Sequence, residues 1–433
     1  MSERHERPEA PTPVREARPA REGTAPHRTR RVVGVAALAV GLTVAVVVGL
    51  GLAATSWSTG IRLGEGAVEE ATEQPFYTLP SPVAGATPGT LLRSEPIASA
   101  PPGAVAWRVL YHSTDVLGND IVVSGVVVAP DAEPPQGGWP VVSWAHPTTG
   151  SAERCAPSVG IDPFDLIEGL DDLLDAGYVV AATDYSGMGV AGPDSYLVGV
   201  TEGNNVLDAA RAARSLDGVG AGDELVLWGH SQGGQAALFA AERAGSYAPE
   251  LQLKAVGVAA PATDLVALLK ADIGDVSGVT IGAYAFTAYS SVYGPSTPGA
   301  ELDTILTPAA VEAAPRMNEL CLLGQNSELH TIGSPLIGGF LSGDPGTTEP
   351  WATLLEENTP GSSGQPLPVP LFVAQGDVDE LVRPEITAAF VDKQRAAGTE
   401  VTYETLENTG HGLVADRAMP GLMRWLGSLG LPD

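Results

Sequence analysis

A serine lies in a stretch of the chain whose pattern is typical of a nucleophile. The apolar run Leu225–Trp228 precedes Gly229-His230-Ser231-Gln232-Gly233, and a helical run begins directly afterwards. This is G-x-S-x-G between a strand and a helix, a context that puts the serine hydroxyl on a sharp, exposed turn. The flanking glycines permit close backbone contacts, and the helix N-terminus directs amide hydrogens toward negative charge. The alternative is a glycine-rich turn with an incidental serine.

A hydroxyl needs a base to remove its proton, and the base needs a carboxylate to orient it. In sheet enzymes with this turn, the order along the chain is nucleophile, acid, base. The seven histidines are at positions 5, 27, 112, 146, 230, 330 and 411. Among them, His411 alone follows the serine and the strand after which the acid is expected. It lies in a loop with glycines on both sides. The sequence therefore predicts His411 as the base, against the alternative of an ordinary surface-loop histidine.

The acid is expected directly after the apolar run Val369–Ala374. Two aspartates compete there, Asp377 and Asp379. We favour Asp379, because it precedes the next helix, whereas Asp377 is suited to bonding backbone amides within the turn. A metal site at this pair is a further alternative, but it lacks a cluster of His or Cys ligands.

Acyl transfer also requires two N–H donors for the oxyanion that forms in the transition state. The amide of Gln232, next to the serine, is one candidate. The other is expected in the loop after the run Val141–Ala145, where Pro147 has no N–H. Thr148 is the best candidate in that loop, and His146 could instead support the loop by packing.

Strand-like runs alternate with helical ones, which predicts an α/β fold with a mostly parallel sheet covered on both faces. The predicted strands are Val105–His112, Ile121–Ala129, Val141–Ala145, Tyr178–Thr183, Leu225–Trp228, Lys254–Ala259, Val369–Ala374 and Val401–Leu406. The predicted helices are Pro163–Ala176, Asn205–Leu216, Gly234–Ala244, Pro384–Ala397 and Asp416–Leu429.

The alternation is interrupted at about 262–365, where helical pieces occur without a convincing strand. We interpret this stretch as a helical cap inserted into the sheet domain 75–433. Its residues Phe286, Tyr289 and Tyr293 share a helical face with spacing typical of either a cap core or an apolar wall for a substrate.

The N-terminal part of the chain indicates the compartment. Residues 1–31 are rich in Pro, Arg and Glu and are predicted to be a disordered cytoplasmic tail. Residues 32–54 contain no charge and are long enough to span a bilayer, with arginines before them that place the N-terminus inside. A cleaved signal peptide is the alternative. Residues 55–74 are predicted to be a stalk, followed by an extended strap from about Pro75.

The two cysteines are Cys155 and Cys321, so one intramolecular disulfide is possible outside the cell, the alternative being two buried thiols. The formal net charge is −29, and the first 31 residues carry eight arginines against five glutamates. The rest of the chain is therefore strongly acidic, which argues against a nucleic-acid partner.

Several motifs together resemble the secretory lipase family, the lipase A-like group of α/β-hydrolases. They are Pro75-Phe76-Tyr77, His146-Pro147-Thr148-Thr149-Gly150 followed by Cys155-Ala156-Pro157-Ser158, Asp184-Tyr185-x-Gly187-x-Gly189, and the insertion that contains Cys321. The resemblance covers about 75–433. It implies a helical cap, no cofactor, a Ser231–Asp379–His411 triad and a Cys155–Cys321 disulfide. The chain departs from the family in its apparent anchor and in Pro147, where relatives often have glycine.

We therefore expect an extracellular, membrane-anchored serine hydrolase of lipid esters, with triacylglycerol lipase as the most specific hypothesis. The resemblance gives no oligomeric state. Alternatives are a short-chain carboxylesterase, an acyltransferase acting on cell-envelope molecules, or an inactive hydrolase fold retained as a binding module.

Overall fold

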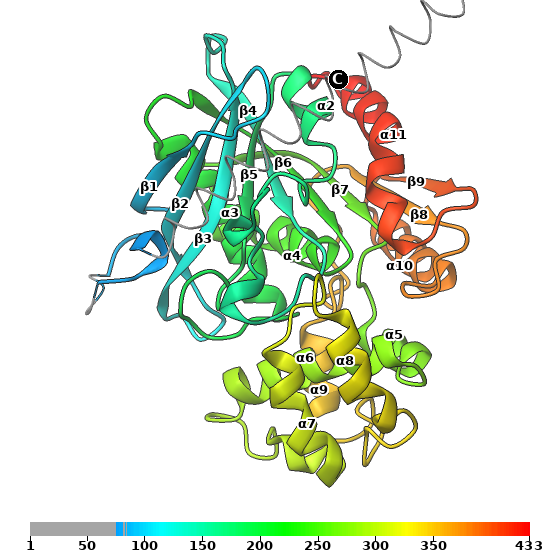
Figure 1. The fold of residues 1–433 in the computed structure, drawn as a ribbon. Coiled ribbons are helices and arrows are strands. Elements are labelled where there is room, and N and C mark those ends of the chain that lie inside the picture. The colour runs from blue at the N-terminus through cyan, green and yellow to red at the C-terminus, as the bar shows by residue number, and fades with distance from the viewer. Residues whose placement is uncertain (1–74, 81–82, 84) are drawn as a thin grey trace, which may run out of the picture. The chain divides into compact units, whose positions relative to one another are not determined.

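The computed structural model describes residues 75–80, 83 and 85–433 (Figure 1). The tail 1–31, the predicted membrane segment 32–54 and the stalk 55–74 lie outside these residues. Within the described part of the chain, no helix combines the length and apolarity that crossing a membrane requires.

The sheet has nine strands in the order β1-β2-β3-β5-β4-β6-β7-β8-β9. The strands are β1 Leu91–Ile97, β2 Ala104–Thr114, β3 Asp120–Pro130, β4 Trp139–Ala145, β5 Val179–Thr183, β6 Ala221–His230, β7 Gln252–Ala259, β8 Leu371–Gly376 and β9 Val401–Leu406. β1, β2, β3 and β5 pair antiparallel, and the pairings from β5 through β4 to β9 are parallel. The predicted mostly parallel α/β sheet is confirmed.

Helices cover both faces of the sheet. They are α2 Leu170–Asp175, α3 Gly199–Ser215, α4 Gln232–Tyr247, α10 Pro384–Ala397 and α11 Val414–Ser428. Side chains of α3, α4 and α10 share one apolar core with the sheet, and those of α2 and α11 share the other. Strand side chains alternate between the two cores: in β4, Val141 belongs to the first and Trp144 to the second. Parallel strands buried on both faces explain the continuous apolar runs in the sequence.

The sequence prediction was wrong for the segment before α2. A helix was expected over Pro163–Ala176, but the structure begins it at Leu170. The carbonyls of Leu166 and Glu168 instead accept hydrogen bonds from the indoles of Trp144 (2.8 Å) and Trp228 (3.1 Å). Gly169 then adopts φ +86°, which interrupts a helix.

The strap prediction also missed a strand. β1, expected to be part of an extended strap, pairs with β2 at the edge of the sheet. Its Ser94–Pro96 segment is exposed, which is typical of an edge strand and explains the weak apolar signal.

Between β7 and β8 the chain forms helices with a core of their own. They are α5 Leu265–Asp272, α6 Val276–Tyr293, α7 Pro308–Asn318, α8 Asn326–Gly333 and α9 Trp351–Glu357, with short 3₁₀ turns at Leu302–Thr304 and Ser334–Leu336. This cap surrounds a separate apolar cluster, and Figure 1 shows it beyond the ends of the sheet strands. A single bridge between Leu306 and Leu341 is the β-pairing here among the described residues.

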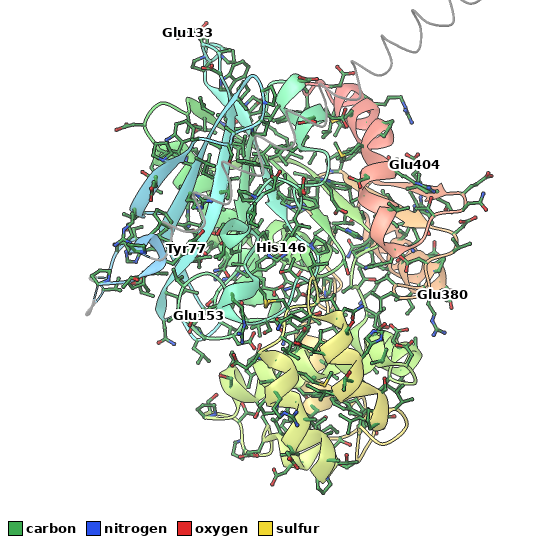
Figure 2. All side chains as sticks on the ribbon, viewed as in Figure 1. Tyr77, Glu133, His146, Glu153, Glu380 and Glu404 are labelled. Atoms are coloured by element: carbon green, nitrogen blue, oxygen red, sulfur yellow. A yellow bond between two sulfur atoms is a disulfide. The ribbon has the colours of Figure 1, made fainter. Side chains whose placement is uncertain are left out.

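The acidic charge lies mainly at the surface. Figure 2 shows Glu133 and Glu380 at the periphery and His146 in the interior, in agreement with their exposure. The further 3₁₀ turns, Glu153–Cys155, Pro157–Val159 and His411–Leu413, lie in loops at the site described next.

Candidate active site

Ser231 occupies a strained turn between β6 and α4. Its backbone has φ 58° and ψ −115°, and its N–H donates to the carbonyl of Ala259 on β7 at 2.9 Å. A Cβ on Gly233 would overlap the carbonyl oxygen of Ala145, and one on Gly229 would overlap that of Gly233. Glycine is therefore required at both positions, because helix and strand backbones meet here without room for a side chain. The turn directs the serine hydroxyl away from the sheet.

The hydroxyl is the first member of a hydrogen-bonded chain of three side chains. Nε2 of His411 is 2.9 Å from Oγ of Ser231, and its Nδ1 is 2.8 Å from Oδ2 of Asp379. The second carboxylate oxygen of Asp379 accepts the N–H groups of Leu381 (3.0 Å) and Val382 (2.9 Å). The buried carboxylate is thus fixed in one orientation and in turn fixes the imidazole. The structure brings together all three residues predicted from the sequence.

Asp377 takes no part in the hydrogen-bonded series from Ser231 through His411 to Asp379. Its side chain is exposed, and Oδ1 accepts the N–H of Thr409 at 3.3 Å. It supports the loop that precedes His411, which is the turn-shaping role expected from the sequence.

The surroundings of His411 favour its neutral form. Burial lowers the pKa of His411 below its ordinary value, the hydrogen bond that His411 donates to Asp379 opposes this shift, and the charge of His230 adds to it. A neutral imidazole is the form that can accept a proton from a hydroxyl.

The residues expected to supply the oxyanion donors lie beside the serine. Gln232 and Thr148 line the same cavity as Ser231. The Thr148 hydroxyl is 2.8 Å from that of Tyr196, and the side-chain Nε2 of Gln232 donates to Glu202 at 2.7 Å. His146 supports this loop by packing, since its ring lies 4.5 Å from that of Tyr185. Hydrogen bonds thus fix the positions of the Thr148 and Gln232 side chains. The backbone N–H groups of these two residues remain the expected oxyanion donors.

The predicted disulfide joins this loop to the cap. Cys155 and Cys321 are bonded, so the alternative of two free thiols is wrong. The neighbouring N–H of Leu322 donates to the carbonyl of Thr149 at 2.8 Å. The cap is therefore fastened beside Thr148 by a covalent bond and a hydrogen bond.

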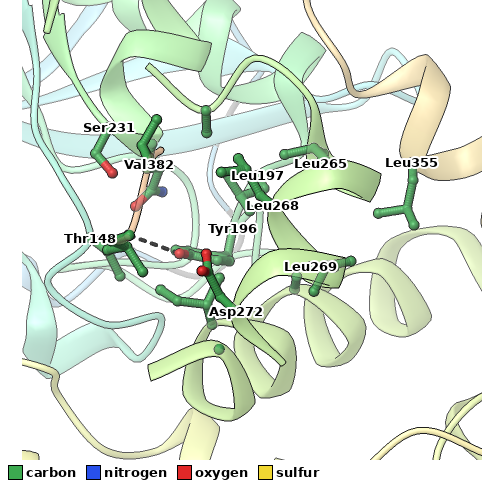
Figure 3. A pocket seen from close by; sticks show the side chains of 16 residues that line it. Thr148, Tyr196, Leu197, Ser231, Leu265, Leu268, Leu269, Asp272, Leu355 and Val382 are labelled. Atoms are coloured by element: carbon green, nitrogen blue, oxygen red, sulfur yellow. Dashed lines mark hydrogen bonds between the residues drawn. The ribbon is translucent and has the colours of Figure 1, made fainter. Parts of the chain in front are cut away.

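A narrow cavity of about 60 Å³ runs from Ser231 into the cap. Figure 3 shows its lining: aliphatic residues, the Thr148–Tyr196 hydroxyl pair and the carboxyl group of Asp272. The aromatic face of α6 does not contribute, because Phe286 packs on Phe340 and Trp351 inside the cap. Of the two interpretations of these aromatic residues, the cap core is the one the structure supports.

A sequence model of secretory lipases matches residues 165–428, more than half of the chain. The chain belongs to the secretory lipase family. Two relatives of this chain are similar along most of their length. A Mycobacterium tuberculosis protein named as a probable inactive lipase is 26% identical over 386 residues, covering 82% of this chain and 81% of the relative. Lipase A of Arthroderma benhamiae is 27% identical over 387 residues, covering 82% and 78%.

Solved structures share the fold of this chain. The crystal structure of Candida antarctica lipase A in its closed state has a TM-score of 0.69 at 18% identity, covering 84% of this chain and 87% of that one. A rice cell wall degrading esterase from Xanthomonas oryzae has a TM-score of 0.61 at 18% identity, covering 79% and 99%. The predicted α/β-hydrolase fold is thereby confirmed.

The sequence did not predict three polar residues that lie at this site. Glu168 bonds His230, with Oε2 2.7 Å from Nδ1. Glu202, fully buried, accepts from Gln232, and burial raises its pKa well above the ordinary value. Asp272 lines the cavity. Glu168 lies in a predicted helix, Asp272 lies in the predicted insertion and Glu202 precedes the predicted helix Asn205–Leu216, so no local pattern distinguishes them from surface acids.

Proposed function

We propose that this secretory lipase hydrolyses carboxylic esters of lipids through an acyl-enzyme formed on Ser231. The observation that carries the proposal is the continuous chain from Ser231 Oγ through His411 to Asp379, with contacts of 2.9 and 2.8 Å. Family membership and the lipase and esterase folds of the structural neighbours support an ester as substrate. Triacylglycerol is the most specific substrate hypothesis.

In the first half of the proposed reaction, Oγ of Ser231 bonds to the carbonyl carbon while Nε2 of His411 takes the hydroxyl proton. Asp379 stabilises the imidazolium that results. The amides of Gln232 and Thr148 donate to the oxyanion. The bond to the alcohol then breaks, and His411 returns the proton to the departing oxygen.

In the second half, water attacks the acyl-enzyme carbonyl and gives its proton to His411. The bond to Ser231 breaks, Oγ regains a proton, and the carboxylic acid leaves. In each half the positive charge on His411 is balanced by the oxyanion of the tetrahedral intermediate, and water is the one reactant besides the ester.

Substitution of Ser231 tests the proposal. We expect Ser231→Ala to abolish hydrolysis of a short-chain nitrophenyl ester while leaving the circular dichroism spectrum and thermal transition intact. Retention of activity in this variant would rule out the mechanism.

One relative is named as a probable inactive lipase, which makes a binding module the alternative from another class. A fluorophosphonate probe separates the two: an active serine labels at Ser231 and Ser231→Ala does not, whereas a binding module labels in neither. A short-chain esterase is the second enzymatic candidate, favoured by the small volume of the cavity, about 60 Å³. Rates on emulsified long-chain triglyceride against soluble short esters distinguish them.

We also propose that the hydrolase domain faces the outside of the cell and is held there by residues 32–54. The disulfide between Cys155 and Cys321 supports an oxidising compartment. Cell fractionation with N-terminal sequencing tests the anchor: a membrane-bound chain that retains residues 32–54 agrees with it, and a soluble, shortened chain shows signal cleavage instead.

A further inference from the structure

A carboxyl group interrupts the aliphatic wall of the cavity beside Ser231. Asp272 is the last residue of α5 and is 5% exposed. Leu265, Leu268 and Leu269 of the same helix line the cavity with it. Figure 3 shows the carboxyl group of Asp272 turned into the space that these residues surround. A buried carboxyl group in an apolar wall needs an explanation, since its desolvation is unfavourable.

The protein satisfies this carboxyl group incompletely. Its buried Oδ1 has no hydrogen-bond partner among residues 75–80, 83 and 85–433. The nearest cation is Arg383, whose Nη2 lies 3.6 Å from Oδ1, beyond hydrogen-bond distance. The same nitrogen already donates to the carbonyl of Ala271 at 2.8 Å. Oδ1 of Asp272 therefore pairs with Arg383 by charge but accepts no hydrogen bond, and it belongs to a carboxyl group in the lining of the cavity that leads to the serine.

The carboxyl group in the wall of the cavity determines which acyl chains of a substrate bind favourably. A plain alkyl chain would cover the carboxyl group without donating a hydrogen bond to it. A chain that carries a hydroxyl at the right carbon would donate a hydrogen bond to it. Sites built to bond a substrate hydroxyl discriminate strongly against the analogue that lacks it, because the buried acceptor is then left unpaired.

We propose that Asp272 determines acyl specificity, and that the cavity selects esters whose acyl chain carries a hydroxyl group over esters of plain chains of the same length. The inference rests on the proposed function, since it names the substrate class of the same site. Asp272 is thereby a substrate-contacting residue that takes no part in bond cleavage.

The charges around Asp272 make this selection depend on pH. Burial is the largest influence, and with the negative charges of Asp275 and Asp379 it outweighs the opposing charge of Arg383, raising the pKa of Asp272 to about 7. Below pH 7 the group is neutral, and a plain chain meets a smaller penalty. Above pH 7 the group is charged, so discrimination against plain chains grows.

The first experiment compares nitrophenyl esters of one chain length, plain and with a hydroxyl moved stepwise along the chain. For the best hydroxyl position we expect kcat/KM of the wild type to exceed that of the plain ester by roughly tenfold. In Asp272→Leu the ratio falls to one or below. A ratio of one at every position in the wild type, or a ratio unchanged by Asp272→Leu, overturns the proposal.

The second experiment isolates the charge. The ratio of kcat/KM for the plain long-chain ester to that for the acetate ester cancels the titration of His411, which both share. We expect this ratio to fall in the wild type as pH rises through about 7 and to stay flat in Asp272→Asn. A cap–core ion pair with Arg383 as the sole role of Asp272 predicts equal changes for both esters, which would contradict the proposal.

Asp264→Asn is the matched control, because Asp264 is exposed and caps the other end of α5, where asparagine also caps. It should keep the wild-type ratios. Fluorophosphonate labelling and the acetate rate show in each variant that the triad is intact. Absence of labelling in the wild type defeats the proposed function itself, whereas labelling with no hydroxyl preference defeats the specificity proposal alone.

Discussion

The imidazole of His230 lies against that of His411, with ring centroids 5.0 Å apart and planes tilted by 44°. His230 precedes Ser231 at the end of β6, and its Nδ1 is 2.7 Å from Glu168 Oε2. A second histidine–carboxylate pair thus stands beside the first. Positive charge on His230 opposes protonation of His411 and contributes to the lowered pKa of that base.

Replacement of His230 should therefore move the pH profile. In His230→Gln the pKa of His411 rises, so the acid limb of kcat/KM shifts to higher pH. The rate on the alkaline plateau should stay within about tenfold of the wild type, since neither triad hydrogen bond involves His230. A pH series with a soluble ester measures both. His330→Gln, on the exposed side of α8, is the control and should leave the profile unchanged. An acid-shifted limb in His230→Gln would contradict the argument.

The two neighbouring aspartates allow a paired test of the acid. Asp379→Asn should lower kcat by roughly 10³–10⁴-fold, because the imidazole loses the acceptor that fixes its tautomer. Asp377→Asn should retain most activity, since it contacts a backbone amide in the loop. Steady-state kinetics of the two purified variants decide between them. Equal losses in both would mean that the loop, and not the Asp379–His411 bond, controls the rate.

Two glycines of one helix provide a packing test. A Cβ at Gly233 overlaps the carbonyl of Ala145, whereas a Cβ at Gly245, near the other end of α4, meets nothing within 4 Å. Gly233→Ala should lower the free energy of unfolding by at least about 2 kcal/mol, through backbone displacement. Gly245→Ala should raise it by about 0.5–1 kcal/mol, through helix propensity. Denaturant unfolding monitored by tryptophan fluorescence measures both, and a neutral Gly233→Ala would show that the turn has room to relax.

Loss of the disulfide should lower both the free energy of unfolding and the activity of the protein. Its cysteines are separated by 166 residues, so the double variant Cys155→Ala/Cys321→Ala should unfold at lower denaturant, with a loss of about 3–5 kcal/mol. Activity should fall as well, because the bond fastens the cap beside Thr148. Dithiothreitol should produce the same change in the wild type and none in the double variant. An effect of dithiothreitol on the double variant would point to another cause.

The sequence predicted those parts of the fold whose pattern is local. Eight strands were found because most of them are buried on both faces and are therefore continuous apolar runs. The helix over Pro163–Ala176 was wrong because two buried indoles, distant in sequence, claim its carbonyls. β1 was missed because an edge strand with exposed Ser94 and Pro96 has little apolar pattern.

The residues of the site also divide into those that a pattern in the sequence identifies and those that it does not. Ser231 was found from its strand–turn–helix context, and His411 from chain order, because both signals lie in the sequence itself. Glu168 and Asp272 could not be found, since their positions depend on where a loop stops and how the cap lies over the sheet. A carboxylate at helical spacing looks the same in sequence whether it faces water or a buried cavity.

The cap leaves the sheet after β7 and returns at β8, and these two strands are hydrogen-bonded neighbours. The inserted chain therefore begins and ends at nearly one place, so its length and content can change while the strand order is preserved. Such an architecture allows the insertion that lines the cavity to be exchanged as one unit. The three residues of the proposed triad lie outside the insertion and would be unchanged. Cys321, the disulfide partner of Cys155, lies in the inserted chain, so an insertion without this cysteine would leave Cys155 unpaired.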